Sequence, residues 1–165
     1  MFVLGHTGIT LGIFYFIAKR FNVEPDFRYV IIGSMLPDAM DKFVSLLTVG
    51  DIFTNGRVFG HSLLFVLLLA SLNGNFIWLA GGSLVHDMLD NFWAFPGTFF
   101  WPLMGNFASY SVPDISYWID NILLQPYTVF GEIAGFLALM HILFRHKLYD
   151  KDNLAHFMGT GKLIL

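Results

Sequence analysis

The chain has 165 residues, which is a typical length for one domain. Hydrophobic residues make up 56% of it and charged residues 13%, against about 45–50% and about 25% in soluble domains, and the mean hydropathy is +0.64. This composition excludes a disordered chain and favours a membrane protein. The net charge of -3, without a basic block, argues against nucleic acid as a partner, and the absence of cysteine excludes thiolate metal sites and cysteine nucleophiles.

Long stretches without charge predict membrane helices. Asp, Glu, Lys and Arg are absent from residues 1–18, 58–86 and 91–113, and about 20 apolar residues suffice to cross a bilayer. The predicted fold is an all-α, polytopic membrane helical bundle of about five helices in a single domain, 1–165. The expected segments are 2–18, 29–49, 57–72, 76–90 and 128–144. The third and fourth are short for complete spans and, joined by a tight turn at 73–75, should be antiparallel neighbours.

Residues 91–127 predict a different kind of structure. They contain four prolines and eleven aromatic residues, so one continuous helix is excluded and the membrane interface is favoured. We expect an aromatic-rich interfacial loop with short helical pieces, acting either as a lid or only as an anchor at headgroup level. The tail from Lys147 onward is more polar and is expected outside the bilayer.

The basic residues predict an orientation. Lys19, Arg20 and Arg28 follow the first segment, and further basic residues follow the fifth. Because cytoplasmic loops carry an excess of Lys and Arg, five spans place the N-terminus outside and the C-terminus in the cytoplasm. The expected location is a prokaryotic cytoplasmic (inner) membrane.

Ionisable residues inside apolar segments are functional candidates, because the bilayer makes them costly. When the five segments are traced in alternating directions, seven of these residues fall toward the outer face. They are His6, Asp38, Asp41, His61, His86, Asp90 and Glu132. His141 falls toward the inner end and is interpreted as a packing or interfacial residue, with His146 and His156 at the surface.

The spacing of the candidates favours a metal site. His86 and Asp90 are four residues apart and share one helical face, as do Asp38 and Asp41 at a spacing of three. Asp87 ranks behind Asp90 because it points about 100° away from His86. Pro37 should bend the second segment, as happens where a helix lines a cavity. Imidazole and carboxylate ligands without sulfur fit zinc, with manganese or iron as alternatives, and about one to three ions.

Five short motifs occur in order over residues 5–102. They are Gly5-His6-Thr7-Gly8, Leu36-Pro37-Asp38-Ala39-Met40-Asp41, His61-Ser62, His86-Asp87-Met88-Leu89-Asp90 and Trp101-Pro102. With these motifs the sequence resembles the predicted membrane-bound metal-dependent hydrolases of prokaryotic inner membranes. That family is distantly similar to zinc-dependent phospholipase C and the fungal zinc nucleases, which are all-helical phosphoesterases with clustered zinc.

The resemblance implies metal-binding roles for five residues, namely His6, Asp38, His61, His86 and Asp90. It also suggests that Glu132 stands for the last carboxylate of the phospholipases. The sequence departs from the family at Gly56, where many relatives have histidine.

The leading hypothesis is a metal-dependent hydrolase, phosphoesterase-like, that acts on a lipid phosphate or headgroup through metal-activated water. Arg57 or Lys42 would stabilise charge on the phosphoryl oxygens, and Asp41 or Glu132 would act as general base or orient a ligand histidine. A proton or metal transporter is one alternative, which the apolar inner halves of the segments disfavour. A non-catalytic membrane protein with a structural metal cluster is the other.

Overall fold

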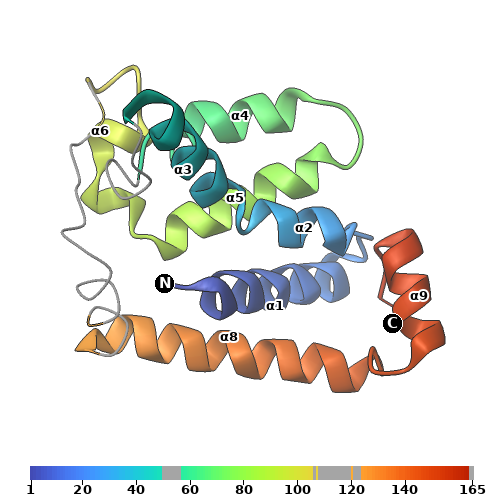
Figure 1. The fold of residues 1–165 in the computed structure, drawn as a ribbon. Helices are drawn as coiled ribbons and strands as arrows, with labels where there is room; N and C mark the ends of the chain where they lie inside the picture. The colour runs from blue at the N-terminus through green and yellow to red at the C-terminus, as the bar shows by residue number, and fades with distance from the viewer. Residues whose placement is uncertain (50–56, 106, 108–119, 121–123, 164–165) are drawn as a thin grey trace.

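The computed structural model describes residues 1–49, 57–105, 107, 120 and 124–163, and all regular elements within them are helices (Figure 1). The predicted all-α class is therefore confirmed for this part of the chain. The longest helices are α1 (Val3–Phe21) and α8 (Pro126–Arg145). Figure 1 shows α8 running along one side of α1, while α2 and α5 lie on its other side.

Small residues bring α1 and α8 into close contact. A Cβ atom at Gly8 would collide with the backbone of Gly135, and one at Gly135 would collide with the carbonyl of Leu4. Glycine at such positions allows two helix backbones to approach, as is common in membrane helix pairs. This contact holds the N-terminal turns of α1, which carry His6, against the middle of α8.

The segment predicted as one helix over 29–49 is two helices. α2 (Phe27–Gly33) ends at Ser34, and α3 (Leu36–Val49) begins immediately before Pro37. Proline has no N–H, so it cannot bond the carbonyl four residues earlier, which is that of Gly33. The hydroxyl of Ser83 donates to this carbonyl instead, at 3.1 Å. The predicted bend at Pro37 is thus a break between α2 and α3. The carbonyl of Gly33, at the end of α2, is hydrogen-bonded to α5 instead.

The predicted segment 57–72 is also shorter than expected. α4 (Leu63–Ser71) begins after Ser62, whose side chain accepts a hydrogen bond from the N–H of Phe65 as a helix cap. Residues 57–62 are therefore a turn, and His61 lies in it. α4 and α5 (Phe76–Leu89) pack against each other as an antiparallel pair, as expected from the short connection (Figure 1).

Among the described residues, α8 alone is long and apolar enough to cross a membrane by length and composition. The bundle of five spans is therefore not confirmed. α4, with 9 residues, covers only about 14 Å, less than half of the hydrocarbon thickness. The predicted orientation of the termini depends on five spans and stays a prediction.

Part of the predicted interfacial loop, residues 106, 108–119 and 121–123, lies outside the described residues. Its first part contains the expected short helical pieces, η1 (Phe92–Ala94) and α6 (Pro96–Phe99). Its assignment as a lid or an anchor stays a prediction. Beyond α8, α9 (Lys151–Thr160) contributes Phe157 to the main hydrophobic core. The core joins residues of α1, α2, α8 and the C-terminal segment, among them Leu11, Phe14, Val30 and Ile142.

Candidate metal centre

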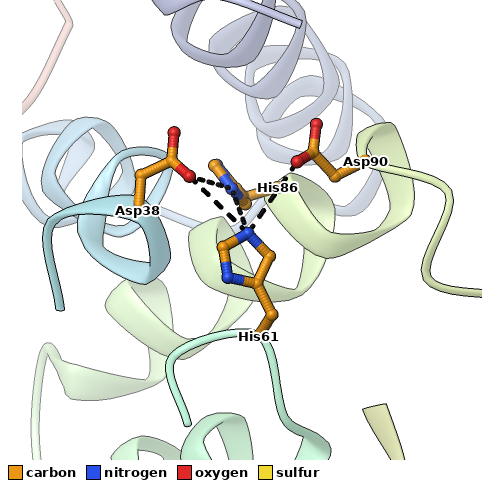
Figure 2. A group of neighbouring side chains, drawn as sticks. All are labelled: Asp38, His61, His86 and Asp90. Carbon is orange, nitrogen blue, oxygen red and sulfur yellow. Dashed lines mark hydrogen bonds and ion pairs between the residues drawn. The ribbon is translucent and has the colours of Figure 1, made fainter. Parts of the chain in front are cut away.

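Four of the predicted ligands converge on one point (Figure 2). They come from the start of α3, the turn before α4 and the end of α5. One ligand atom from each lies within 4.8 Å of the others. The residues are Asp38, His61, His86 and Asp90. Two imidazoles and two carboxylates form a donor set that zinc or manganese accepts.

Asp41 holds His61 in place. Its carboxylate is fully buried and lies 2.7 Å from Nδ1 of His61. The same carboxylate accepts hydrogen bonds from the backbone N–H groups of Val58 at 2.6 Å and Gly60 at 2.5 Å. Because both oxygens of this carboxylate already act as acceptors for backbone N–H groups, we assign Nδ1 of His61 as the protonated nitrogen that donates to it. Asp41 is thus a positioning residue that directs Nε2 of His61 toward the cluster.

A backbone carbonyl orients His86 in the same way. Nδ1 of His86 lies 2.7 Å from the carbonyl oxygen of Ser34, which can only accept, so Nδ1 must donate. The Nε2 atoms of His61 and His86 then face each other at 3.2 Å. In neutral rings, both would present a lone pair to the same small space. A cation between them removes this repulsion, so the residues fit a bound metal.

The two carboxylates close the cluster from either side. Asp38 Oδ1 lies 3.6 Å from Nε2 of His61 and 3.8 Å from Nε2 of His86. Asp90 Oδ2 lies 3.8 Å from Nε2 of His61. The Asp38 side chain is 27% exposed and that of Asp90 is 10% exposed, so the cluster is accessible on the Asp38 side.

Arg57 lies at the edge of the cluster. Its guanidinium forms an ion pair with Asp90 at 2.7 Å and lies 4.7 Å from the ring centroid of Phe95. Its side chain is 28% exposed. A partly exposed guanidinium at this position can exchange its carboxylate partner for an anionic ligand.

His6 lies beside the cluster. Its ring stacks on that of His86 with centroids 4.0 Å apart, and its Nε2 lies 3.1 Å from Asp90 Oδ1. His6 is 1% exposed, and neither of its ring nitrogens has a hydrogen-bond partner of suitable geometry. The structure therefore keeps His6 next to the four ligands but outside the group that surrounds one point.

Glu132 and Lys42, two further predicted catalytic residues, are not part of this group of four. Glu132 caps the first turn of α1, since its Oε1 accepts hydrogen bonds from the N–H groups of Phe2 at 2.7 Å and Gly5 at 3.1 Å. These contacts give Glu132 a structural role between α8 and α1. Lys42 is exposed on α3, next to the buried Asp41.

The structure corrects the surface position predicted for His146 and shows that the carboxylate of Asp87 is buried. His146, expected at the surface, is 6% exposed and packs edge-on against Tyr15, with ring centroids 5.3 Å apart. Asp87 is 1% exposed, and neither carboxylate oxygen has a hydrogen-bond partner. Its place one residue after His86 gave no reason to expect burial, although its spacing of three from Asp90 puts both carboxylates on one helical face.

A family model described as YdjM inner membrane protein matches residues 1–151. The chain belongs to the YdjM inner membrane protein family. The expected location in a prokaryotic inner membrane is therefore supported, whereas the family description names no activity, metal or substrate. Neither the curated proteins nor the solved structures contain a match to this YdjM family member. The matched range includes all four residues of the cluster, together with His6, Asp41 and Asp87.

Proposed function

We propose that the protein is a membrane metal-dependent hydrolase that cleaves a phosphoester of a membrane lipid. The observation that carries the proposal is the pair of imidazole Nε2 atoms, which face each other at 3.2 Å between two carboxylates. Each ring is held by a hydrogen bond from its Nδ1 atom. His61 donates to the carboxylate of Asp41, and His86 donates to the carbonyl of Ser34. Such preorganised ligands are typical of metal centres.

Each residue of the site has a distinct part in the proposed reaction. A divalent metal held by the four ligands would lower the pKa of a water molecule toward about 7 and so supply a nucleophile at neutral pH. Asp41 and the Ser34 carbonyl keep the two imidazoles aligned. Arg57 is placed to bind a phosphoryl oxygen, because planar guanidinium groups recognise phosphate well.

The accessibility of the site favours catalysis over a purely structural metal. Structural zinc sites have a closed shell of four ligands, whereas catalytic sites keep a position open, so a catalytic role requires that one of the four groups gives way to water or substrate. Here the Asp38 side chain is 27% exposed, and a small cavity adjoins His61 and Asp90. Asp38 is the most exposed of the four groups, so the proposed reaction has the substrate approach from its side.

The surroundings of the site favour a lipid substrate. α3, which carries Asp38 in its first turn, also carries the exposed apolar side chains of Phe43, Leu46 and Leu47. In a member of an inner-membrane family, such side chains are suited to contact lipid. The proposal includes the orientation expected from the basic residues, in which the site faces the outer leaflet.

A combined metal and activity measurement tests the proposal. Detergent-purified protein is analysed for metal by mass spectrometry and assayed with bis(p-nitrophenyl) phosphate and with phosphatidic acid vesicles. We expect bound zinc or manganese and phosphate ester hydrolysis in the unmodified protein, and loss of both in His86→Ala. His156→Ala, which removes an exposed histidine of α9, is the matched control and should retain both.

The outcomes separate the candidate functions. An unmodified protein without metal after reconstitution contradicts the metal centre and would favour proton or solute transport. Stoichiometric metal without hydrolysis of either substrate contradicts the phosphoesterase and would favour a structural metal.

A further inference from the structure

Helix α8 ends in a turn that redirects the chain. The N–H of Lys147 donates to the carbonyl of Phe144 at 3.3 Å. The N–H of Leu148 donates to the carbonyl of Leu143 at 2.9 Å, and Lys147 is left-handed, with a φ of 48°. This pair of hydrogen bonds around a left-handed residue is a common way to end a helix with a change of direction. α9 therefore lies across the ends of α1 and α8 instead of continuing the axis of α8 (Figure 1).

α9 has an apolar and a polar face. At about 100° per residue, its polar side chains share one half of the helix. They are Asp152, Asn153, His156 and Thr160. On the other half, Phe157 is buried in the main core. Leu154 and Met158, four residues apart, extend this half beyond the core and are 45% and 62% exposed. The apolar face of α9 is thus only partly covered by the bundle.

An exposed apolar strip on α8 leads toward α9. Its side chains share one face of α8 and are Phe130, Ile133, Leu137 and Phe144. The ring of Phe144 lies beside that of the exposed Tyr149, with centroids 6.3 Å apart. The apolar surface therefore continues past the end of α8 into the connection to α9.

The end of α8 sets the level of α9 in a bilayer. The 20 residues of α8 measure about 30 Å, which equals the thickness of the hydrocarbon core. Arg145 and Lys147 follow at the end of this helix, and basic side chains at helix ends reach the headgroups. Because α9 begins at Lys151 and turns sideways, it lies at the same level.

We propose that α9 is an interfacial helix, which lies on the phospholipid surface at the C-terminal end of α8 and inserts Leu154 and Met158 between the headgroups. Amphipathic helices in such positions bury their apolar face by about 5–10 Å. Lys151, at the edge of the apolar face, is placed to meet lipid phosphates, while Asp152 and His156 face water. The proposal depends on the inner-membrane location and on α8 as a span, and not on the proposed metal chemistry.

Site-directed spin labelling tests the position of α9. The sequence contains no cysteine, so one introduced cysteine carries the only label. Leu154→Cys and Met158→Cys of the full chain are labelled with a nitroxide and reconstituted into vesicles of phosphatidylethanolamine and phosphatidylglycerol. Power saturation compares collisions with O₂, which concentrates in the bilayer, with those of a water-soluble nickel chelate. We expect O₂ to dominate at both positions, at a depth of about 5–10 Å.

Asp152→Cys and His156→Cys, on the opposite face of α9, are the matched controls and should respond mainly to the nickel chelate. Leu137→Cys is the lipid reference on α8 and should lie deeper than either test position. A nickel response at Leu154 and Met158 equal to that of the controls places α9 in water and overturns the proposal. Low access of both reagents shows that protein, such as a second copy, covers this face, which also overturns it. A nickel-dominated label at Leu137 overturns the span on which the level of α9 depends.

Discussion

The best-defined residue interaction of the site is the contact between Asp41 and His61. The carboxylate accepts three hydrogen bonds, two from backbone N–H groups and one from the imidazole. The backbone donors hold the carboxylate, and the carboxylate holds the ring. Asp41 thus links the turn at 57–62 to α3 and sets the direction of one metal ligand.

Replacing Asp41 with asparagine should weaken metal binding. The amide would turn an N–H₂ group toward at least one backbone donor, and His61 would lose its charged acceptor. We expect about a 10- to 100-fold rise in the metal dissociation constant, as for other groups that orient ligand histidines. The measurement is zinc titration well below the unfolding temperature, with circular dichroism to show that the variant is folded. Unchanged affinity in a folded Asp41→Asn would show that the carboxylate does not position His61.

At the scale of elements, the contact between α1 and α8 determines where the first histidine lies. The two helices touch through backbone atoms at Gly8 and Gly135, and Glu132 caps the start of α1. Backbone contacts of this kind cannot relax as side chains can. His6 therefore keeps its stacked position on His86 only while α1 and α8 stay in close contact.

Gly8→Ala should lower the thermal unfolding temperature, because the added methyl group would meet the backbone of Gly135. Overpacking of this kind costs about 1–3 kcal/mol. Gly159→Ala in α9 is the matched control, since no atom lies within 4 Å of its added Cβ. The control should raise stability slightly, by about 0.5–1 kcal/mol, because alanine favours the helix. Equal unfolding temperatures for both variants would contradict the close contact.

At the scale of the whole molecule, residues 158–161 near the C-terminus are hydrogen-bonded to the start of α2. Arg28 donates to the carbonyls of Met158 at 2.8 Å and Gly159 at 3.0 Å, and the N–H of Phe27 donates to Gly161 at 2.8 Å. Arg28 also pairs with Asp26, whose Oδ2 lies 2.7 Å from the guanidinium. These contacts join the C-terminal segment to the N-terminal end of α2.

The ion pair between Arg28 and Asp26 predicts that the stability of the fold depends on pH. Hydrogen bonds from Arg28 hold the pKa of Asp26 below its usual value, although burial opposes the shift. The ionised carboxylate therefore stabilises the fold above the unfolded pKa, about 3.9, and this contribution disappears as the pH falls through the lower folded pKa. We expect the unfolding temperature to fall less between pH 6 and pH 3 in Asp26→Asn than in the unmodified protein. Parallel pH profiles for the two proteins would refute this role of Asp26.

The sequence by itself determined that this is a membrane protein and which residues form the His/Asp cluster. Its apolar composition predicted a membrane protein, and the family match supports that location. The spacing of His86 and Asp90 on one helical face and the change in helix direction near Pro37 follow from local geometry that the sequence alone specifies. All four residues of the cluster are among the seven ionisable residues that the sequence placed toward one face.

Only the tertiary structure decided the roles that depend on contacts between distant residues. Glu132 is a helix cap because α1 happens to begin beside it, and Asp87 is buried without a partner because η1 and α6 cover its face of α5. The burial of His146 against Tyr15 has the same origin. Local periodicity reports which face of a helix a residue occupies, whereas packing between helices determines what that face meets.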